Sequence, residues 1–229
     1  QIPSLRNKFP TYDSYARAGM NEIFPESVLK EAYTRSCNYF QSAWIENLGN
    51  GTFRIHALPS EAQISPVFGI LTGDFNSDEN PDILLAGNYC SSNVYTGNYD
   101  ASIGLLLSGN GKGDFEPVPG RRSGFFADGD VKAMAELTGA DSNPVILIAR
   151  NSDTLIVFRN RRSFNSIIRL KSDDANADLS FQNGTKEYVE FYYGSGYLSK
   201  SSRVLRVTAG VDNVSFTGFT GKIRKVKIK

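Results

Sequence analysis

Two stretches of the sequence decide the fold: Asn80-Pro-Asp-Ile-Leu-Leu-Ala86 and Asn143-Pro-Val-Ile-Leu-Ile-Ala149. Each places a turn dipeptide before an unbroken run of apolar side chains, which predicts a short buried strand. Their prolines stand at 81 and 144, an offset of 63, and a second pair of anchors, Asn50–Phe53 and Gly111–Phe115, has its phenylalanines at an offset of 62. Two independent anchors whose offsets agree within one residue indicate an internal repeat.

Short strand patterns, separated by Gly, Asn, Asp and Pro, fill the repeated region. In the first unit they cover 43–46, 52–58, 67–71 and 82–86, and a third unit opens with 154–158, which matches 103–107. A repeat of about four short strands has the size of a propeller blade. We therefore expect a mainly β protein with a partial β-propeller of about two four-stranded blades. The two blades could belong to a longer propeller of which this chain is a piece, or they could stack on each other as a compact sandwich. We favour the first interpretation.

The two ends of the chain differ from the repeats. N-cap residue types at 11–14 and Pro25 predict two short helices, over 12–23 and 26–34, in an N-terminal helical appendage at 1–36. The β repeats occupy 37–162. After a polar, turn-rich boundary at 172–178, alternating side chains at 188–193, 203–208 and 222–228 predict a C-terminal all-β module at 163–229.

Composition excludes several classes of protein. Among 229 residues, 25 Lys and Arg balance 24 Asp and Glu, so no global field attracts nucleic acid, and the basic residues near the C-terminus fit the solvent face of a strand. No apolar run approaches the roughly 18–20 residues of a membrane span. One histidine and two cysteines exclude a four-cysteine zinc site. Cys37 and Cys90 can pair only if the fold brings them together, and separate thiols are favoured.

One loop carries metal chemistry. Asp74-Phe-Asn76-Ser-Asp78-Glu-Asn80-Pro-Asp82 places side-chain oxygens at every second position between two apolar strands. Calcium takes six to eight oxygen ligands in irregular geometry, so we expect Ca²⁺ to be held by Asp74, Asn76, Asp78, Asp82 and the backbone carbonyl of Asn80. A solvated Asp/Asn-rich turn is the alternative. The equivalent loop, 137–145, keeps Asp141 but lacks the other acidic ligands, and we predict that it is metal-free.

These motifs resemble the FG-GAP, or VCBS, repeats of bacterial surface proteins and integrin alpha-chain propellers. The resemblance rests on the hairpin Gly49-Asn-Gly-Thr-Phe53, the loop 74–82 and the strand 83–86. Glu79 departs from the family, which has glycine at that position of the loop. The segment Gly194-Ser-Gly-Tyr-Leu-Ser199 resembles the ASPIC/UnbV module that often follows such repeats.

The resemblance implies a secreted, periplasmic or outer-cell-surface protein in which calcium rigidifies the blades for adhesion or ligand display, without catalysis. We therefore expect protein or glycan binding through aromatic rings in loops. The tyrosines in turn-rich stretches are Tyr89, Tyr95, Tyr99, Tyr192, Tyr193 and Tyr197.

Two other functions are weighed against binding. One is a structural spacer within a larger surface protein. The other is a glycan-acting hydrolase that uses the carboxylates of Asp128 and Asp130. The second has little support, because the single histidine, His56, lies in a strand pattern and Ser195 lacks a nucleophile-elbow motif. We expect no enzymatic activity, and the sequence predicts no oligomeric state.

Overall fold

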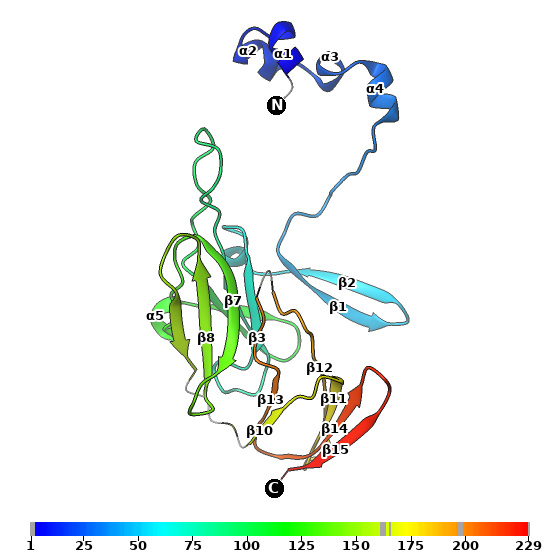
Figure 1. The fold of residues 1–229 in the computed structure, drawn as a ribbon, viewed down its shortest axis with the longest axis vertical. Helices are drawn as coiled ribbons and strands as arrows, with labels where there is room; N and C mark the ends of the chain where they lie inside the picture. Colours follow the sequence, from blue (N-terminus) through cyan, green and yellow to red (C-terminus); the bar gives the residue numbers. More distant parts are fainter. Residues whose placement is uncertain (1–2, 161–163, 165, 197–198, 229) are drawn as a thin grey trace. The chain divides into compact units, whose positions relative to one another are not determined.

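The computed structural model describes residues 3–160, 164, 166–196 and 199–228 (Figure 1). The chain divides into two compact units, Gln1–Phe40 and Gln41–Lys229. The boundary predicted between residues 36 and 37 lies close to this division. The boundary predicted between residues 162 and 163 lies outside the described residues.

The first unit contains four short helices rather than the two predicted. They are α1 (Pro3–Lys8), α2 (Tyr12–Arg17), α3 (Met20–Ile23) and α4 (Glu26–Glu31). Thr11 caps α2 through a capping box with Ser14. The helix predicted over 12–23 breaks because Ala18 and Gly19 are extended, and no helical residue is buried to offset the cost of ordering a longer helix.

The second unit is built around a four-stranded antiparallel sheet. Its strands lie in chain order: β3 (Gly69–Gly73), β4 (Asp82–Ala86), β5 (Leu105–Gly109) and β6 (Phe115–Val118). Every residue of β4 is buried, because its side chains alternate between two cores. Ile83 and Leu85 join one core with Leu58 and Leu107, whereas Leu84 joins the other.

The second core lies between this sheet and a three-stranded sheet. That sheet consists of β7 (Val131–Thr138), β8 (Pro144–Arg150) and β9 (Ile156–Arg159), and β3 lies beside β7 (Figure 1). Leu84 pairs with Leu106, and Leu147 pairs with Val157. These are equivalent positions of the predicted repeat, so the strand register agrees with the alignment of the units.

The first two strands form a separate hairpin, β1 (Ala43–Gly49) with β2 (Thr52–Ala57). The prediction that each sequence unit forms one four-stranded blade is therefore wrong, since the sheet β3–β6 takes two strands from each unit. The segment between β2 and β3 cannot continue the pairing of β2, because it contains two prolines, Pro59 and Pro66, and the 3-10 turn η1 (Ser60–Ala62). Strand β3 therefore begins a new sheet.

Trp44 anchors this hairpin to the central sheet. Its ring meets the Phe115 ring on β6 at a centroid distance of 6.3 Å. At Gly113 a Cβ atom would lie 2.5 Å from the indole, so this position requires glycine. Within the hairpin, the His56 ring stacks on the Trp44 ring at a centroid distance of 4.3 Å. His56 Nε2 lies 2.8 Å from Glu46 Oε2. His56 is thus a partnered histidine of a strand pair.

The C-terminal region has its own core and two sheets. One pairs β10 (Ser166–Arg169) with β13 (Val204–Val207), and the other has the order β12 (Lys186–Glu190), β11 (Asp174–Phe181), β14 (Val211–Gly218), β15 (Ile223–Lys227). Val207, Val214 and Phe216 are fully buried in this core. The all-β character predicted for this region is confirmed.

One prediction about local structure is wrong. The polar boundary at 172–178 is largely strand, because Ala177 enters the core and Asp174 is buried beside Arg224. A short helix, α5 (Gly120–Ser123), lies between β6 and β7. The predicted mainly β class is confirmed, with five small antiparallel sheets in the described part of the chain, none of them closed.

Leu107→Ala tests the two-sided core. Leu107 is 0% exposed, so we expect the substitution to lower the free energy of unfolding by about 2–5 kcal/mol through lost contacts and a residual cavity. Chemical denaturation measures the change. Leu155→Ala is the matched control, because Leu155 is 54% exposed and should change stability by less than about 1 kcal/mol. Equal losses for both variants would contradict the assigned core.

Candidate functional site

The candidate metal loop connects β3 to β4 and is closed at its base by the pairing of Gly73 with Asp82. Asp82 is 0% exposed. Its Oδ2 accepts hydrogen bonds from the backbone N–H of Phe75 at 2.8 Å and of Asn76 at 3.2 Å, and its Oδ1 accepts from Gly109 N–H at 3.0 Å. One buried carboxylate therefore ties the start of the loop to strand β5.

Asp74 organises the outer part of the loop. Its Oδ1 accepts hydrogen bonds from the backbone N–H of Ser77 at 2.7 Å and of Asp78 at 3.2 Å, while Oδ2 accepts from Glu79 N–H at 2.8 Å. Three successive N–H groups thus point at one carboxylate, which fixes the chain as a turn around Asp74. Such a concave array of N–H groups stabilises negative charge.

The other predicted ligands contact one another. Asn76 Nδ2 donates to Asp78 Oδ2 at 2.8 Å, and the backbone N–H of Asn80 donates to Asp78 Oδ1 at 2.8 Å. The structure therefore brings residues 76, 78 and 80 together on the outside of the turn, whereas the carboxylates of Asp74 and Asp82 face backbone N–H groups.

Glu79 occupies the position where the resembled family has glycine. Its φ of 69° lies in the left-handed region, as does the φ of 68° at Ser77. A non-glycine residue there costs about 1–2 kcal/mol. The hydrogen bond from Glu79 N–H to Asp74 helps to offset that cost, so the loop keeps the turn that glycine would allow more easily.

The donor types of the loop fit a hard cation. Each carboxylate offers about four lone-pair sites, and N–H donors take three at Asp74 and three at Asp82. Across the described ranges of the chain, no three His, Cys, Asp or Glu side chains are gathered around a common point as a metal site. Calcium binding thus stays a prediction that rests on the donor set and spacing.

A pocket of about 370 Å³ adjoins the loop and was not predicted from the sequence. Its wall comes from the loop and from the β5–β6 hairpin, including Asp78, Asn80, Ser108, Asp114 and Glu116. Asn76 Nδ2 donates to Ser108 Oγ at 2.8 Å and so joins the two segments. At Gly109 a Cβ atom would lie 2.0 Å from the Pro81 carbonyl oxygen, so only glycine permits this approach.

The equivalent loop between β7 and β8 is tighter. Its ladder extends to the pairing of Thr138 with Pro144. Asp141 Oδ1 accepts from Asn143 N–H at 3.2 Å, as Asp78 does from Asn80. Hydrogen bonds from Asn143, together with the charge of Arg159 at 3.1 Å, hold the pKa of the Asp141 carboxyl below its ordinary value. That this loop is metal-free stays a prediction.

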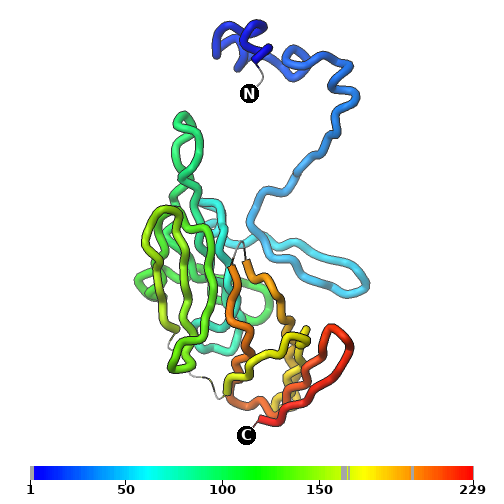
Figure 2. The backbone as a smooth tube through the Cα atoms, in the orientation of Figure 1, coloured from blue at the N-terminus to red at the C-terminus, as the bar shows by residue number. Residues whose placement is uncertain are grey.

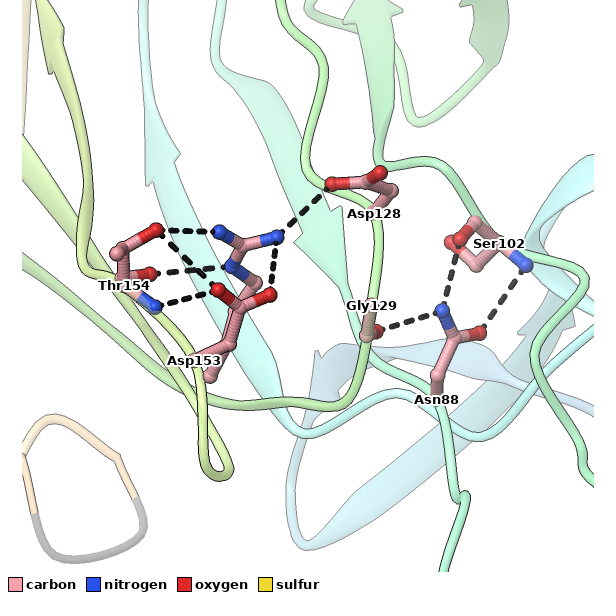
Figure 3. A network of polar contacts seen from close by, with 7 residues as sticks. Asn88, Ser102, Asp128, Gly129, Asp153 and Thr154 are labelled. Carbon is pink, nitrogen blue, oxygen red and sulfur yellow. Dashed lines mark hydrogen bonds and ion pairs between the residues drawn. The ribbon is translucent and has the colours of Figure 1, made fainter.

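The two carboxylates considered for glycan hydrolysis, those of Asp128 and Asp130, form ion pairs with different basic side chains. Asp128 Oδ1 lies 3.2 Å from Arg150, which also pairs with Asp153 at 2.9 Å (Figure 3). Asp130 is buried, and its Oδ1 lies 2.6 Å from Lys132 Nζ. The ion pair of Asp128 therefore connects the segment before β7 to the end of β8, whereas Asp130 reaches the turn after β8 through a hydrogen bond from Asn151 Nδ2 at 3.1 Å.

Asn88 is a fully buried amide that the sequence did not single out. Its Nδ2 donates to the carbonyls of Ser102 and Gly129, both at 2.8 Å, and its Oδ1 accepts from Ser102 N–H (Figure 3). The same Oδ1 also accepts a hydrogen bond from Ser65 Oγ. All its hydrogen-bonding capacity is used within the protein. We infer a structural role, in which Asn88 joins the end of β4 to the segments before β5 and β7.

The two cysteines are free thiols. Burial, reinforced by the negative charge of Asp130, raises the pKa of the Cys90 thiol. A raised pKa keeps the thiol protonated and so lowers its reactivity.

Comparison with models of protein families and with curated protein sequences finds no match to this chain. None of the helices in the described ranges has the length and apolar character needed to cross a bilayer. The resemblance to FG-GAP/VCBS repeats therefore rests on the motifs and is carried below as a proposal.

Asp82→Asn tests the buried anchor of the loop. The asparagine amide presents N–H₂ toward backbone donors, so at least one buried N–H loses its acceptor, and we expect a loss of about 1–3 kcal/mol in unfolding free energy. The measurement is chemical denaturation in EDTA, which removes any effect of bound metal. Asp100→Asn, on an exposed residue, is the control. If Asp82→Asn lowered the unfolding free energy no more than the control variant does, Asp82 would not be the anchor of the loop.

Asp130→Asn tests the pH dependence of stability. Burial raises the pKa of Asp130, but hydrogen bonds from Lys132, Asn151 and the Cys90 N–H outweigh it, so the pKa lies below its ordinary value. The stabilisation is therefore fully present above the unfolded-state pKa of about 3.9 and is lost as the pH falls through the folded-state value.

We expect Asp130→Asn to be less stable than wild type at pH 7, with a difference that shrinks below about pH 4. Thermal unfolding at a series of pH values gives this difference directly. A difference that stays constant from pH 7 to pH 3 would show that the Asp130 charge does not stabilise the fold.

Proposed function

We propose that this protein is a calcium-stabilised β-repeat protein that binds a protein or glycan ligand. The observation that carries the calcium assignment is Asp82, a fully buried carboxylate that fixes an oxygen-rich loop between two buried strands. A carboxylate in such a position is costly to retain for a simple surface turn, because burial of a charge requires compensating partners.

The residues proposed to hold calcium are Asp74, Asn76, Asp78 and Asp82 with the backbone carbonyl of Asn80. When bound, the ion would neutralise the three carboxylates and cross-link the two ends of the loop. The protein's own contribution is to fix the turn: the left-handed Glu79 and the N–H groups around Asp74 set the positions of the donors in advance.

We further propose that the sheets β3–β6 and β7–β9 are blades of a partial β-propeller. The sequential order of their strands and the equivalent pairings Leu84–Leu106 and Leu147–Val157 support this interpretation. The C-terminal region is proposed as an ASPIC/UnbV-like module, although two residues of its quoted motif, Tyr197 and Leu198, lie outside the described residues.

Ligand binding is proposed to involve the projecting segment between β4 and β5. Figure 2 shows this segment as a narrow loop that extends away from the sheets, and a bridge between Tyr89 and Tyr99 closes its base. Val94 and Tyr95 at its tip are 94% and 93% exposed. Exposed apolar and aromatic groups on a projecting loop support a contact surface over a purely structural spacer.

The same proposal places the protein outside the cytoplasm: secreted, periplasmic or on the outer cell surface. Support comes from the proposed calcium loop, because extracellular calcium modules bind with dissociation constants of about 10⁻⁴–10⁻³ M, a range suited to loops with few acidic ligands.

Calcium-dependent melting tests the metal assignment. We expect calcium at a hundred times its dissociation constant to stabilise the native state by about 2.7 kcal/mol, and EDTA to reverse the shift in Tm. Magnesium should give a smaller shift, because it demands octahedral geometry. Differential scanning calorimetry provides the readout.

The variant Asp78→Ala should abolish the calcium-induced shift, whereas Asp141→Ala, in the equivalent loop, should retain it. Calcium at about 10 mM exceeds the dissociation constants of weak extracellular sites. A wild-type Tm that is the same at this calcium concentration and in EDTA would refute the calcium assignment.

A further inference from the structure

A second pocket, of about 440 Å³, lies between the turn of β7–β8 and the strand pair β10–β13. Its volume falls in the range of pockets that hold small molecules. The polar and charged residues that line it are Thr138, Ser142, Ser202, Arg169 and Arg203, and no acidic residue lines it among the residues described. It shares no residue with the candidate calcium loop.

One wall of the pocket is fixed by hydrogen bonds between β7 and the segment before β13. Ser202 N–H donates to the Glu136 carbonyl at 2.8 Å, and Thr138 N–H donates to Ser202 Oγ at 3.1 Å. Glu136 N–H donates in turn to Ser201 Oγ at 3.0 Å. The Ser202 hydroxyl is therefore held in place, and Thr138 Oγ1 accepts a hydrogen bond from the Arg206 guanidinium at 3.3 Å, so less entropy is lost when a ligand binds.

Arg203 is held by its surroundings without a carboxylate partner. Its guanidinium lies 4.1 Å from the centroid of the Tyr193 ring. Its N–H groups donate to three backbone carbonyls, those of Lys171, Asp174 and Tyr192, at 3.3, 2.7 and 3.3 Å. A guanidinium has five N–H donors, so donors remain, and its full positive charge is not neutralised by an acid.

The side chain of Arg169, at the exposed end of β10, forms no hydrogen bond or ion pair with any described residue, and its backbone pairs with Val204 of β13. On the wall formed by the β7–β8 turn, Asp141 precedes the lining residue Ser142, but its carboxylate already pairs with Arg159 at 3.1 Å. Two arginines and no described carboxylate therefore line the pocket, which creates a local positive potential in a protein whose formal charge is only +1.

We propose that this pocket binds the oxyanion group of a small hydroxyl-bearing molecule. Arg169 would hold the oxyanion through two parallel N–H donors, the geometry in which guanidinium groups bind carboxylate, sulfate or phosphate. The hydroxyls of Thr138, Ser142 and Ser202 would bond the rest of the ligand, against the apolar side chains of Ile167 and Leu170. An acidic monosaccharide and a free inorganic oxyanion share the chemistry that Arg169 recognises.

Titration with three probes tests this proposal on the full chain. Isothermal titration calorimetry in EDTA and low salt would compare glucuronate, inorganic phosphate and glucose. We expect saturable binding of glucuronate and no binding of the uncharged glucose, with weaker binding at higher salt. If phosphate binds as well as glucuronate, the site recognises the oxyanion alone, whereas a preference for glucuronate identifies the acidic sugar.

Arg169→Gln should weaken anion binding by about tenfold or more. Because the Arg169 side chain forms no hydrogen bond or ion pair with a described residue, its replacement should leave the Tm unchanged, and an unchanged Tm excludes misfolding as the cause of lost binding. Arg122→Gln, on the exposed helix α5, is the matched control and should bind as wild type does.

Failure of both anions to bind, or equal binding by Arg169→Gln and wild type, would overturn the proposal. Because every titration is done in EDTA, its outcome is independent of the calcium assignment.

Discussion

The burial of β4 on both faces is the constraint on which the second unit depends. Ile83 and Leu85 pack into one core, while Leu84 and Ala86 pack into another. A strand with two apolar faces cannot lie at the surface, so it requires a covering layer on each side. The sheet β7–β9 covers one face, and Trp44 of the β1–β2 hairpin contributes to the other.

The candidate metal loop takes its rigidity from that strand. Asp82 is both the first residue of β4 and the acceptor for three backbone N–H groups, so the loop begins where the core begins. The three N–H donors compensate the carboxylate for the water that it loses on burial. Core packing and loop geometry are therefore coupled through one side chain, and the donors of the loop are positioned by the fold as a whole.

Local sequence patterns predicted strands near 43–58, 67–86 and 143–149, because branched apolar runs between turn residues specify strands without reference to the rest of the chain. Strand β7 was not predicted. The local patterns also predicted the oxygen spacing of the loop that starts at Asp74. They failed at 172–178, where a polar pattern forms strand β11: Asp174 is tolerated inside the protein because Arg224, fifty residues later, neutralises it. No local pattern contains that partner.

The sequence by itself determined the mainly β class and the donor types at Asp74 through Asp82, since each follows from residue type and spacing along the chain. Tertiary structure alone decided how strands were shared between sheets, which carboxylates bond backbone N–H groups, and that Arg169 and Arg203 line one pocket. The physical reason is that strand pairing, charge compensation and pocket formation join residues far apart in the chain, and their energies depend on distances that only the folded state defines.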